Sequence, residues 1–429
     1  MNIWIFSSYF LPEVSAVSGL LKDLIETLIV NKDVEKITVI TNFSKWPIKK
    51  LVKYFKFPVV KIESHNKLKI IRVLSLPVLK KHPAIVKGMR HLWDIFSSSI
   101  GAIIALFFGK PDVIFLISPP LFTVLPALSF SKVFRIPMVL NVQDLFPQYL
   151  IDLGLLKNPI LIKIFKALEK FAYKKADVIF VHSEGNKDFI IKNYFIESDK
   201  IKVIYNWIDT EEYTPNENKG FLTELGLDKS KFIVFFGGTI GYSQAAETII
   251  NAARLIEKND PEILFLIVGD GPAKPIVMKM AEEYGLKNIK FVQTQPMNKF
   301  PYVIACADVC LVTLRKTVKT PVVPSKLLGI MASGKPAIVS VPESSDAKKI
   351  IENCDCGIWV EAENAEKLAE SILDLKKSPE YRKKLGRNGR NYVMKHFDRR
   401  IQTQRILNIF KRLLKEVQNG TKIRKRISR

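Results

Sequence analysis

The stretch FIVFFGGTIGYSQAAETIINAARLIEKNDPEILFLIVGDG, from Phe232 to Gly271, contains one complete strand–helix–strand unit. Two hydrophobic runs that each end in glycine enclose a segment, 245–258, in which apolar residues recur at helical spacing. Two buried strands joined by a helix predict a parallel βαβ unit, because parallel strands need a long crossover connection. The segment 273–284 predicts the next helix.

The same alternation continues on both sides of this unit. Before it, hydrophobic runs at 2–6, 36–41, 69–74, 112–118, 138–144 and 177–183 alternate with predicted helices at 18–30, 92–108 and 160–173. After it come runs at 289–292, 309–314, 337–341 and 357–360, then helices at 365–376 and 380–395. The polar segment 210–220 predicts a linker. We therefore expect an α/β protein with two Rossmann-like, doubly wound domains facing a cleft, at 1–205 and 221–390. The remaining unit, 391–429, is expected to hold a C-terminal helix, whose amphipathic and basic segment is 399–417, and a basic tail.

Composition supports two globular domains. The chain has 429 residues, of which 48% are hydrophobic and 25% charged, which excludes a disordered protein. Its 4 cysteines form two close pairs, Cys306/Cys310 and Cys354/Cys356. Cysteine usage this sparse excludes a disulfide scaffold and predicts a reducing compartment. The spacing fits no standard zinc site, so no metal is expected.

The charge is strongly basic and unevenly placed. Lys+Arg number 66 against 42 Asp+Glu, a formal net charge of +24. The block Lys45–Arg90 contains 13 basic residues and one acid, Glu63, and it runs into the apolar stretch 95–108. A second basic cluster occupies 422–429. Cations beside apolar anchors favour an anionic membrane surface, so we expect 45–108 to dock the first domain there. A solvated basic face is the plain alternative. Nucleic acid is not expected, because no helix-turn-helix, zinc-finger or RNA-binding signature is present.

No segment is expected to span a membrane. The first residues carry no basic region before their apolar stretch, which indicates a buried strand and not a signal peptide. The stretch 95–108 is shorter than the roughly 20 residues that a spanning helix needs, and 113–131 contains three prolines. The first of these stretches is also compatible with a helix lying in the membrane plane.

Two glycine-rich turns and one helix start are candidates for an anion site. Gly237–Gly241 and Gly269–Pro272 each follow a hydrophobic run, where backbone N–H groups can approach a phosphate. Glycine there is also ordinary turn chemistry. In Val322–Pro336, Pro324 predicts a helix start with Ser325 and Lys326 in its first turn. A cation is disfavoured at that end of a helix, so Lys326 indicates a bound anion. The alternative is a solvent-exposed lysine.

An ordered set of segments now resembles a known family. The chain is similar to the nucleotide-sugar-dependent glycosyltransferases of the GT-B fold, family 4, in particular the branch that builds O-antigen and colanic-acid-type glycans. The segments span nearly the whole chain in family order: Tyr9-Phe-Leu-Pro-Glu13, Asn141-Val-Gln-Asp-Leu-Phe-Pro147, Lys202-Val-Ile-Tyr-Asn-Trp207, Gly238–Gln244, Val268–Pro272, Pro324–Pro336 and Gly386-Arg-Asn-Gly-Arg390.

The resemblance implies a nucleotide-sugar site in the second domain and an acceptor site in the first. It makes Lys326 the cation for the leaving phosphate, with supporting N–H groups at Ser325 and Lys326. It makes Asp144 the acceptor-side acid and Glu13 the first-loop glutamate, both counted as catalytic with Lys326. It implies retention of configuration and no metal or other cofactor. The other implied nucleotide-sugar-binding residues are Gly238, Thr239, Gly241, Gln244, Gly269, Gly271 and Arg315.

The sequence departs from the family at several of these positions. Thr239 and Gln244 stand where the family has Arg and Lys, and Pro321 and Gly329 stand where it has two glutamates. Ser15 and Ala16 replace two glycines beside the donor phosphate. Nearby Arg315, Lys316 and Lys319 are candidate replacements for the missing cations or plain surface charges. His182, after the run 177–181, is either a contact for diphosphate or acceptor or a satisfied strand-end histidine.

The leading hypothesis is a retaining glycosyltransferase in cell-surface polysaccharide synthesis. It would move a hexosyl or N-acetylhexosaminyl group from a nucleotide-sugar donor, expected to be a UDP-sugar, to a polyprenyl-diphosphate-linked or other lipid acceptor. The expected location is cytoplasmic, peripheral on the inner face of the cell membrane. The alternatives are a non-catalytic nucleotide-sugar-binding scaffold, suggested by the departures, and an RNA-binding protein, suggested by the charge.

Overall fold

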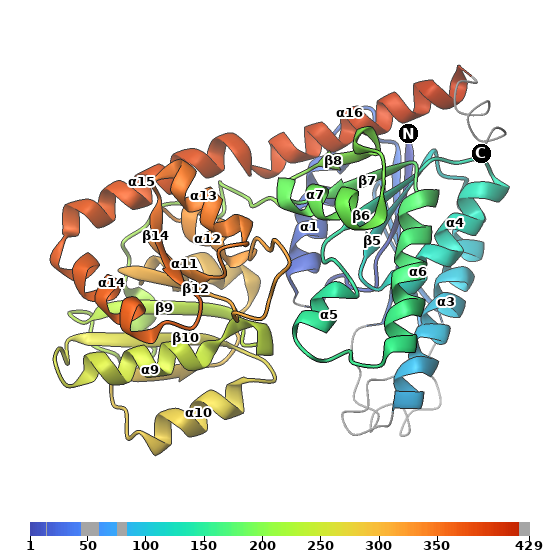
Figure 1. Cartoon of the computed structure of the whole chain (residues 1–429). Helices are drawn as coiled ribbons and strands as arrows, with labels where there is room; N and C mark the ends of the chain where they lie inside the picture. The colour runs from blue at the N-terminus through green and yellow to red at the C-terminus, as the bar shows by residue number, and fades with distance from the viewer. Residues whose placement is uncertain (14, 44–59, 75–83, 420–429) are drawn as a thin grey trace, which may run out of the picture.

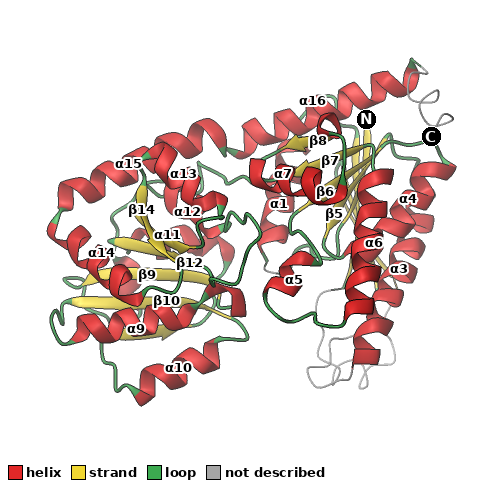
Figure 2. Cartoon of the chain, viewed as in Figure 1, coloured by secondary structure: helices red, strands yellow, loops and turns green. Residues whose placement is uncertain are grey.

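The alternating strands and helices of the sequence build two separate sheets (Figures 1 and 2). The computed structural model describes residues 1–13, 15–43, 60–74 and 84–419. The first sheet forms the domain on the right of Figure 1, and the second forms the domain on the left. About half of the basic block Lys45–Arg90, at 45–59 and 75–83, and the cluster at 422–429 lie outside the described residues. Within them, no helix is long and apolar enough to cross a membrane.

The first sheet has eight strands in the order β3-β4-β2-β1-β5-β6-β7-β8. All neighbouring strands are parallel except β3 and β4, which form an antiparallel pair. The strand bounds are β1 (Asn2–Phe6), β2 (Lys36–Asn42), β3 (Val60–His65), β4 (Leu68–Val73), β5 (Val113–Ser118), β6 (Met138–Val142), β7 (Val178–Val181) and β8 (Ile201–Val203).

Alternate residues of these strands feed two hydrophobic cores, one on each face of the sheet. Ile3 and Ile5 of β1 point to the face covered by α1 (Ala16–Ile29) and α16 (Arg399–Gln418). Trp4 and Phe6 point to the opposite face, covered by α3 (Ala84–Leu106), α4 (Val124–Val133) and α6 (Pro159–Lys175). The domain also contains the short helices η1 (Leu121–Thr123), α5 (Gln148–Asp152) and η2 (Ser198–Lys200) and the helix α7 (Glu184–Tyr194).

The second sheet has six parallel strands in the order β11-β10-β9-β12-β13-β14. The strand order reverses between β9 (Phe232–Thr239) and β12 (Val309–Thr313), and ligands of doubly wound sheets bind at such a reversal. The other strands are β10 (Ile263–Asp270), β11 (Ile289–Val292), β13 (Ala337–Val341) and β14 (Gly357–Glu361). The helices are α8 (Gly220–Glu224), η3 (Tyr242–Gln244), α9 (Ala246–Glu257), α10 (Lys274–Glu283), η4 (Met297–Lys299), α11 (Phe300–Ala305), α12 (Lys326–Ala332), α13 (Asp346–Cys354), α14 (Ala365–Lys377) and α15 (Pro379–His396).

Two chain segments connect the domains and are bonded to each other. The Ile208 amide donates to the Phe397 carbonyl at 3.0 Å, and the Arg399 amide donates to the Ile208 carbonyl at 3.0 Å. After this crossing, α16 packs Phe410 against Phe115 of the first domain, with ring centroids 5.8 Å apart. The final helix, which follows the second domain in the chain, therefore packs against the first domain.

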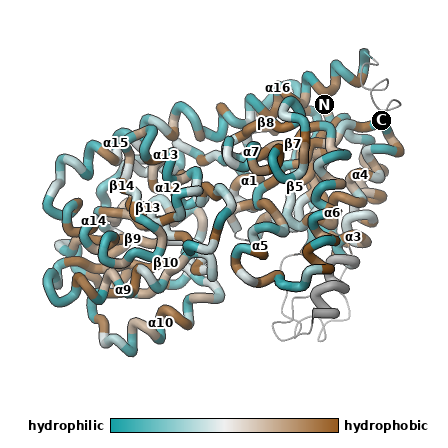
Figure 3. Tube along the Cα trace, in the orientation of Figure 1, coloured by the Kyte–Doolittle hydropathy of each residue, from teal (hydrophilic) through white to brown (hydrophobic). Residues whose placement is uncertain are grey.

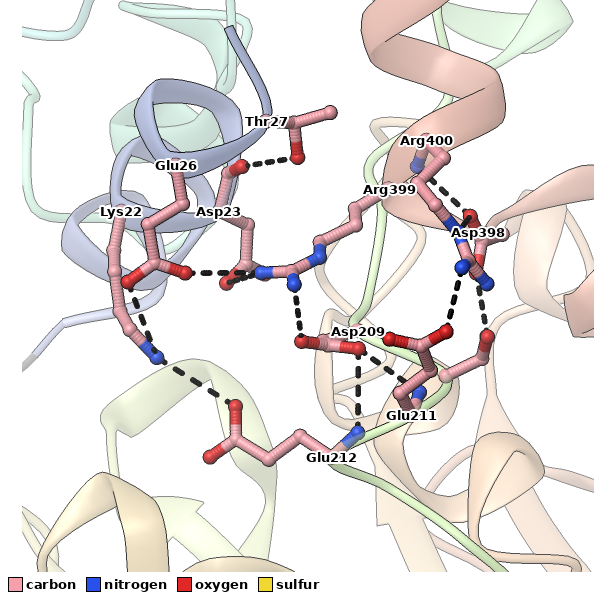
Figure 4. Close-up of polar contacts among 11 residues, drawn as sticks. Lys22, Asp23, Glu26, Thr27, Asp209, Glu211, Glu212, Asp398, Arg399 and Arg400 are labelled. Atoms are coloured by element: carbon pink, nitrogen blue, oxygen red, sulfur yellow. Dashed lines mark hydrogen bonds and ion pairs between the residues drawn. The ribbon is translucent and has the colours of Figure 1, made fainter. Parts of the chain in front are cut away.

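An arginine holds this crossing to α1 (Figure 4). The Arg399 guanidinium lies 3.0 Å from Glu26 Oε2, 3.8 Å from Asp23 Oδ1 and 2.9 Å from Asp209 Oδ2. Burial raises the pKa of Asp23 to about 7, although the charges of Lys22 and Arg399 oppose the shift. The cluster joins the first domain, the linker and the last helix through one side chain.

The structure corrects four points of the sequence analysis. The strand β3 was not predicted, because its burial alternates irregularly at a sheet edge and its sequence VKIESH carries no hydrophobic run. The helices α7 and α13 were likewise missed, whereas α16 coincides with the last segment predicted at 399–417. A disulfide joins Cys354 to Cys356 where reduced thiols were expected, and Asp355 between them has a left-handed backbone with φ 46°.

Candidate active site

The loop after β9 is held by glycines at the end of the neighbouring strand β10. Gly238 pairs with Gly269 in register, and a Cβ on Gly269 would stand 1.9 Å from the Gly238 carbonyl oxygen. A Cβ on Gly271 would stand 2.4 Å from the Ile240 carbonyl oxygen. Both glycines thus allow two backbones to approach, and this packing supports the loop 237–241.

Lys326 carries the most unusual environment among the predicted site residues. Its Nζ is buried, has no hydrogen-bond partner, and lies 3.8 Å from the centroid of the Phe236 ring at the end of β9. Desolvation lowers the pKa of this ammonium to about 7. A buried cation without an anion is unfavourable, and a bound phosphate would supply the missing partner.

Gln244 contributes a second unpartnered polar atom near the same edge. Its Oε1 is buried without a hydrogen-bond partner, while its carbonyl oxygen accepts from Thr313 Oγ1 at the end of β12. The loop that begins at Gly238 and passes Thr239 and Gly241 therefore returns to the point where the strand order reverses. Ser325 directly precedes Lys326 as the N-cap of α12.

Arg315, also predicted to bind the nucleotide sugar, is already paired. Its Nη2 lies 2.9 and 3.1 Å from the two carboxylate oxygens of Glu247, and its Nη1 lies 3.4 Å from Glu363 Oε1. Its Nε donates to the Tyr242 carbonyl at 2.7 Å. The exposed Lys316 pairs with Glu361 at 3.0 Å. In the structure, Arg315 fixes the shape of the loop through these contacts.

The predicted acceptor-side residues follow strands of the first sheet. Asp144 comes two residues after β6; its side chain is exposed to solvent, yet the surrounding protein desolvates the carboxyl enough to raise its pKa. Glu13 lies in the turn after β1, where its amide donates to the Phe10 carbonyl at 3.2 Å. These two residues thus belong to the edge of one sheet, and the glycine loop, Gln244, Arg315 and Lys326 belong to the other.

Several hydrogen bonds bring these two edges together, and three of them lie beside the residues described above. Tyr149 Oη donates to Ser243 Oγ at 2.8 Å. The Asp152 carboxylate accepts from the backbone amides of Lys319 at 2.9 Å and Thr320 at 3.1 Å. The segment that follows Asp144 in the first domain therefore contacts the loops beside Lys326 in the second. Local sequence could not reveal these contacts, because the partners are 94 to 168 residues apart.

His182 is buried with partners of its own. Its Nε2 lies 2.9 Å from the Gln143 carbonyl oxygen and 3.0 Å from the Asn186 side-chain amide. Burial lowers the pKa of His182, which keeps the ring neutral. Of the two alternatives for His182, these contacts match a strand-end histidine whose hydrogen bonds are already made within the protein.

No group of three or more potential metal ligands comes together in the described part of the chain. Among the groups described above, the Lys326 ammonium belongs to one facing edge and the Asp144 carboxyl to the other.

Two family models match consecutive parts of the chain. The model for family 4 glycosyltransferases matches residues 47–212, and the model for group 1 glycosyl transferases matches residues 221–392. The chain belongs to glycosyltransferase family 4. Both the resemblance found in the sequence and the predicted GT-B fold class are confirmed.

Relatives and solved structures agree with this assignment. A putative colanic acid biosynthesis glycosyl transferase of Escherichia coli, WcaI, is 24% identical over 87% of this chain and 91% of its own length. An Escherichia coli UDP-Gal:alpha-D-GlcNAc-diphosphoundecaprenol alpha-1,3-galactosyltransferase is 36% identical over 25% of this chain and 29% of its own. The structure of Anabaena Alr3699/HepE in complex with UDP-glucose has a TM-score of 0.69 at 16% identity and covers 96% of this chain and 99% of that one. At that identity the structure shows a shared fold.

Proposed function

We propose that this glycosyltransferase transfers a sugar from a UDP-sugar, with retention of configuration and without a metal, to a lipid-linked acceptor of cell-surface glycan synthesis. The reaction takes place on the inner face of the cell membrane, where an anionic lipid surface holds the protein.

The observation that carries the proposal is the unpartnered ammonium of Lys326 where the strand order reverses. Breaking the bond between sugar and nucleotide leaves negative charge on the diphosphate, and a preorganised cation stabilises that charge most as it develops. Lys326 supplies this charge from the protein, which is the task a divalent cation would otherwise perform. The amides of Thr239, Gly241 and Ser325 complete the diphosphate site, whereas the Ile240 amide already donates to the Asp270 carbonyl at 2.9 Å.

Asp144 is the acceptor-side group of the proposal. Its raised pKa suits a carboxylate that accepts a hydrogen bond or a proton from the attacking hydroxyl. Retention follows if that hydroxyl attacks on the side from which the diphosphate leaves. The names of two relatives support the substrate classes, since one acts on a diphosphoundecaprenol-linked sugar with UDP-Gal and the other belongs to colanic acid biosynthesis.

The test separates donor binding from transfer. Calorimetry and thermal shift with UDP-, GDP- and ADP-sugars should show one UDP-sugar binding to the wild type and to Asp144→Asn, but not to Lys326→Ala. Lys335→Met is the matched control, because Lys335 is a partly buried lysine just beyond α12 that already donates to the Ala305 carbonyl at 2.7 Å. Transfer to a short-chain polyprenyl-diphosphate sugar should require both Lys326 and Asp144, should persist in EDTA and should yield an axial product by NMR if the donor sugar is axial.

A non-catalytic scaffold is the second candidate. The ion pairs that occupy Arg315 favour it, as do the non-acidic Pro321 and Gly329 at the family's glutamate positions. Tight UDP-sugar binding with neither transfer nor hydrolysis, across lipid-linked acceptors, would establish this reading and overturn the proposed enzyme. Absence of all nucleotide-sugar binding in folded protein would overturn both.

A further inference from the structure

The helix α6 presents an apolar stripe to solvent. Ile160 is 68% exposed, Ile164 51% and Phe171 37%. With the exposed Ala167 they occupy positions i, i+4, i+7 and i+11, which lie along one side of a helix. The opposite side of α6 packs Ala172 and neighbouring residues into the core of the first domain. The comparably long α16 exposes one large apolar side chain, Ile401, so the α6 stripe is not ordinary surface.

All the charges that α6 presents to solvent are positive. Its acidic residue, Glu169, is buried and accepts hydrogen bonds from Tyr173, at 2.6 Å, and from Tyr194. Figure 3 shows hydrophobic and hydrophilic residues alternating along α6, as expected for a helix whose apolar stripe is interleaved with lysines. The lysines that flank the stripe are Lys163, Lys166, Lys170, Lys174 and Lys175.

The helix α3, on the same face of the sheet, also exposes apolar side chains. Phe96 is 54% exposed and Ile103 52%, at positions i and i+7, and Phe107, just after the helix, is 83% exposed. Residues of α3 and α6 share the core on one face of the first sheet, so both helices cover that face. An apolar stripe with cations beside it is what an anionic bilayer attracts, through insertion of the side chains and charge attraction together.

We propose that the exposed face of α6 is the surface that docks on an anionic lipid bilayer. The inference rests on the proposed lipid-linked acceptor and names the contact that brings the protein to it. The Phe165 ring of α6 lies 5.3 Å from the Phe146 ring, two residues beyond Asp144. Docking through α6 therefore sets the acceptor-side loop beside the lipid headgroups.

Vesicle flotation of the full chain tests the docking surface with a matched pair of variants. Ile164→Glu places a carboxylate in the stripe, whereas Ile276→Glu places one at an equally exposed isoleucine of α10, which is 50% exposed in the other domain. Wild type and Ile276→Glu should float with vesicles of phosphatidylglycerol and phosphatidylcholine, and Ile164→Glu should bind at least about tenfold more weakly. Lys163→Gln/Lys166→Gln should also weaken binding, and raised salt should abolish the difference between these lysine variants and wild type.

Transfer to a short-chain acceptor in detergent separates this inference from the proposed function. All variants should keep that transfer, since it needs no bilayer, while Ile164→Glu should lose transfer to an acceptor in vesicles. Equal flotation of Ile164→Glu and wild type overturns the docking surface, even if transfer is intact. A shift of Ile164→Glu from dimer to monomer in gel filtration, with wild-type flotation, would assign the face to a second copy of the chain. Loss of detergent transfer in the wild type would instead overturn the proposed function.

Discussion

Binding of a UDP-sugar is expected to draw a proton onto Lys326. In the free protein, desolvation holds the pKa of this ammonium at about 7, so above that pH the group is largely neutral. A diphosphate beside Nζ favours the charged form and returns the pKa toward the usual value of about 10. Affinity should therefore be fully present below pH 7 and decline as the pH rises above it, the opposite of a site that needs a neutral amine.

The magnitude follows from the pKa. With a free-state pKa of about 7, about one tenth of the molecules carry the charge at pH 8, so the Kd should be about tenfold weaker at pH 8 than at pH 6. Binding at pH 8 should take up about 0.9 proton per UDP-sugar, against about 0.1 at pH 6. A UDP-sugar is the appropriate probe, because both of its phosphates are esterified and neither titrates in this interval.

Calorimetry in two buffers of different ionisation enthalpy measures both quantities. Lys326→Arg is the control, since a guanidinium stays charged throughout this range, and its binding should lose the pH dependence. A wild-type Kd that is equal at pH 6 and pH 8 with no proton uptake would refute the reasoning. So would a Lys326→Arg variant that keeps the wild-type slope, because another group would then be titrating.

Three further predictions concern stability, each measured by urea unfolding. Lys326→Met should stabilise the free protein by at most about 5 kcal/mol at pH 7, and the gain should shrink as the pH rises toward 10, because the folded state holds this lysine below its unfolded pKa. A destabilised Lys326→Met would show that the buried ammonium has an unrecognised partner. Arg399→Met should lower the free energy of unfolding by about 2–4 kcal/mol, because three carboxylates lose their cation. Arg400→Met, at a side chain that is 58% exposed, should lower it by less than about 1 kcal/mol. Equal losses for the two variants would contradict the bridging role of Arg399. Gly269→Ala should cost more than about 3 kcal/mol, since its Cβ meets a carbonyl oxygen, while Gly285→Ala, with φ +65° and no atom within 4 Å, should cost about 1 kcal/mol; a tolerated Gly269→Ala would mean that the loop can move away.

The sheets were predictable because parallel strands are buried on both faces. Each such strand is a nearly continuous apolar run, as VIFLIS in β5 shows with all six residues buried. The edge strand β3 has no such run, and α7 has few apolar residues, so neither gave a periodic signal. The hydrophobic pattern of a sequence therefore indicates which segments are buried, and it does not detect helices and strands at the margin of the core.

The site was predictable only in part. Lys326 was identified from a helix-start motif, but the absence of a partner for its ammonium depends on which strands surround it. Arg315 was expected to bind the donor, and nothing near it in the sequence reveals that it pairs with Glu247, 68 residues away. Local residues thus indicate which groups are available, and tertiary contacts decide which of them remain free for a ligand.

The cations near the site have two different roles: Arg315 stabilises the loop, and Lys326 remains without a partner among the residues that the structure describes. Thr239 and Gln244 bring no cation to the phosphate loop. Arg315 forms an ion pair with Glu247, and its contact with the Tyr242 carbonyl holds the loop in shape. Within the contacts described above, neutralising the diphosphate then falls to Lys326, whose pKa of about 7 means that about half of the free protein molecules hold this amine uncharged at pH 7. Lys326 becomes fully protonated when the donor binds, so the free protein avoids much of the cost of a buried cation. Because donor binding takes up this proton, the affinity depends on pH.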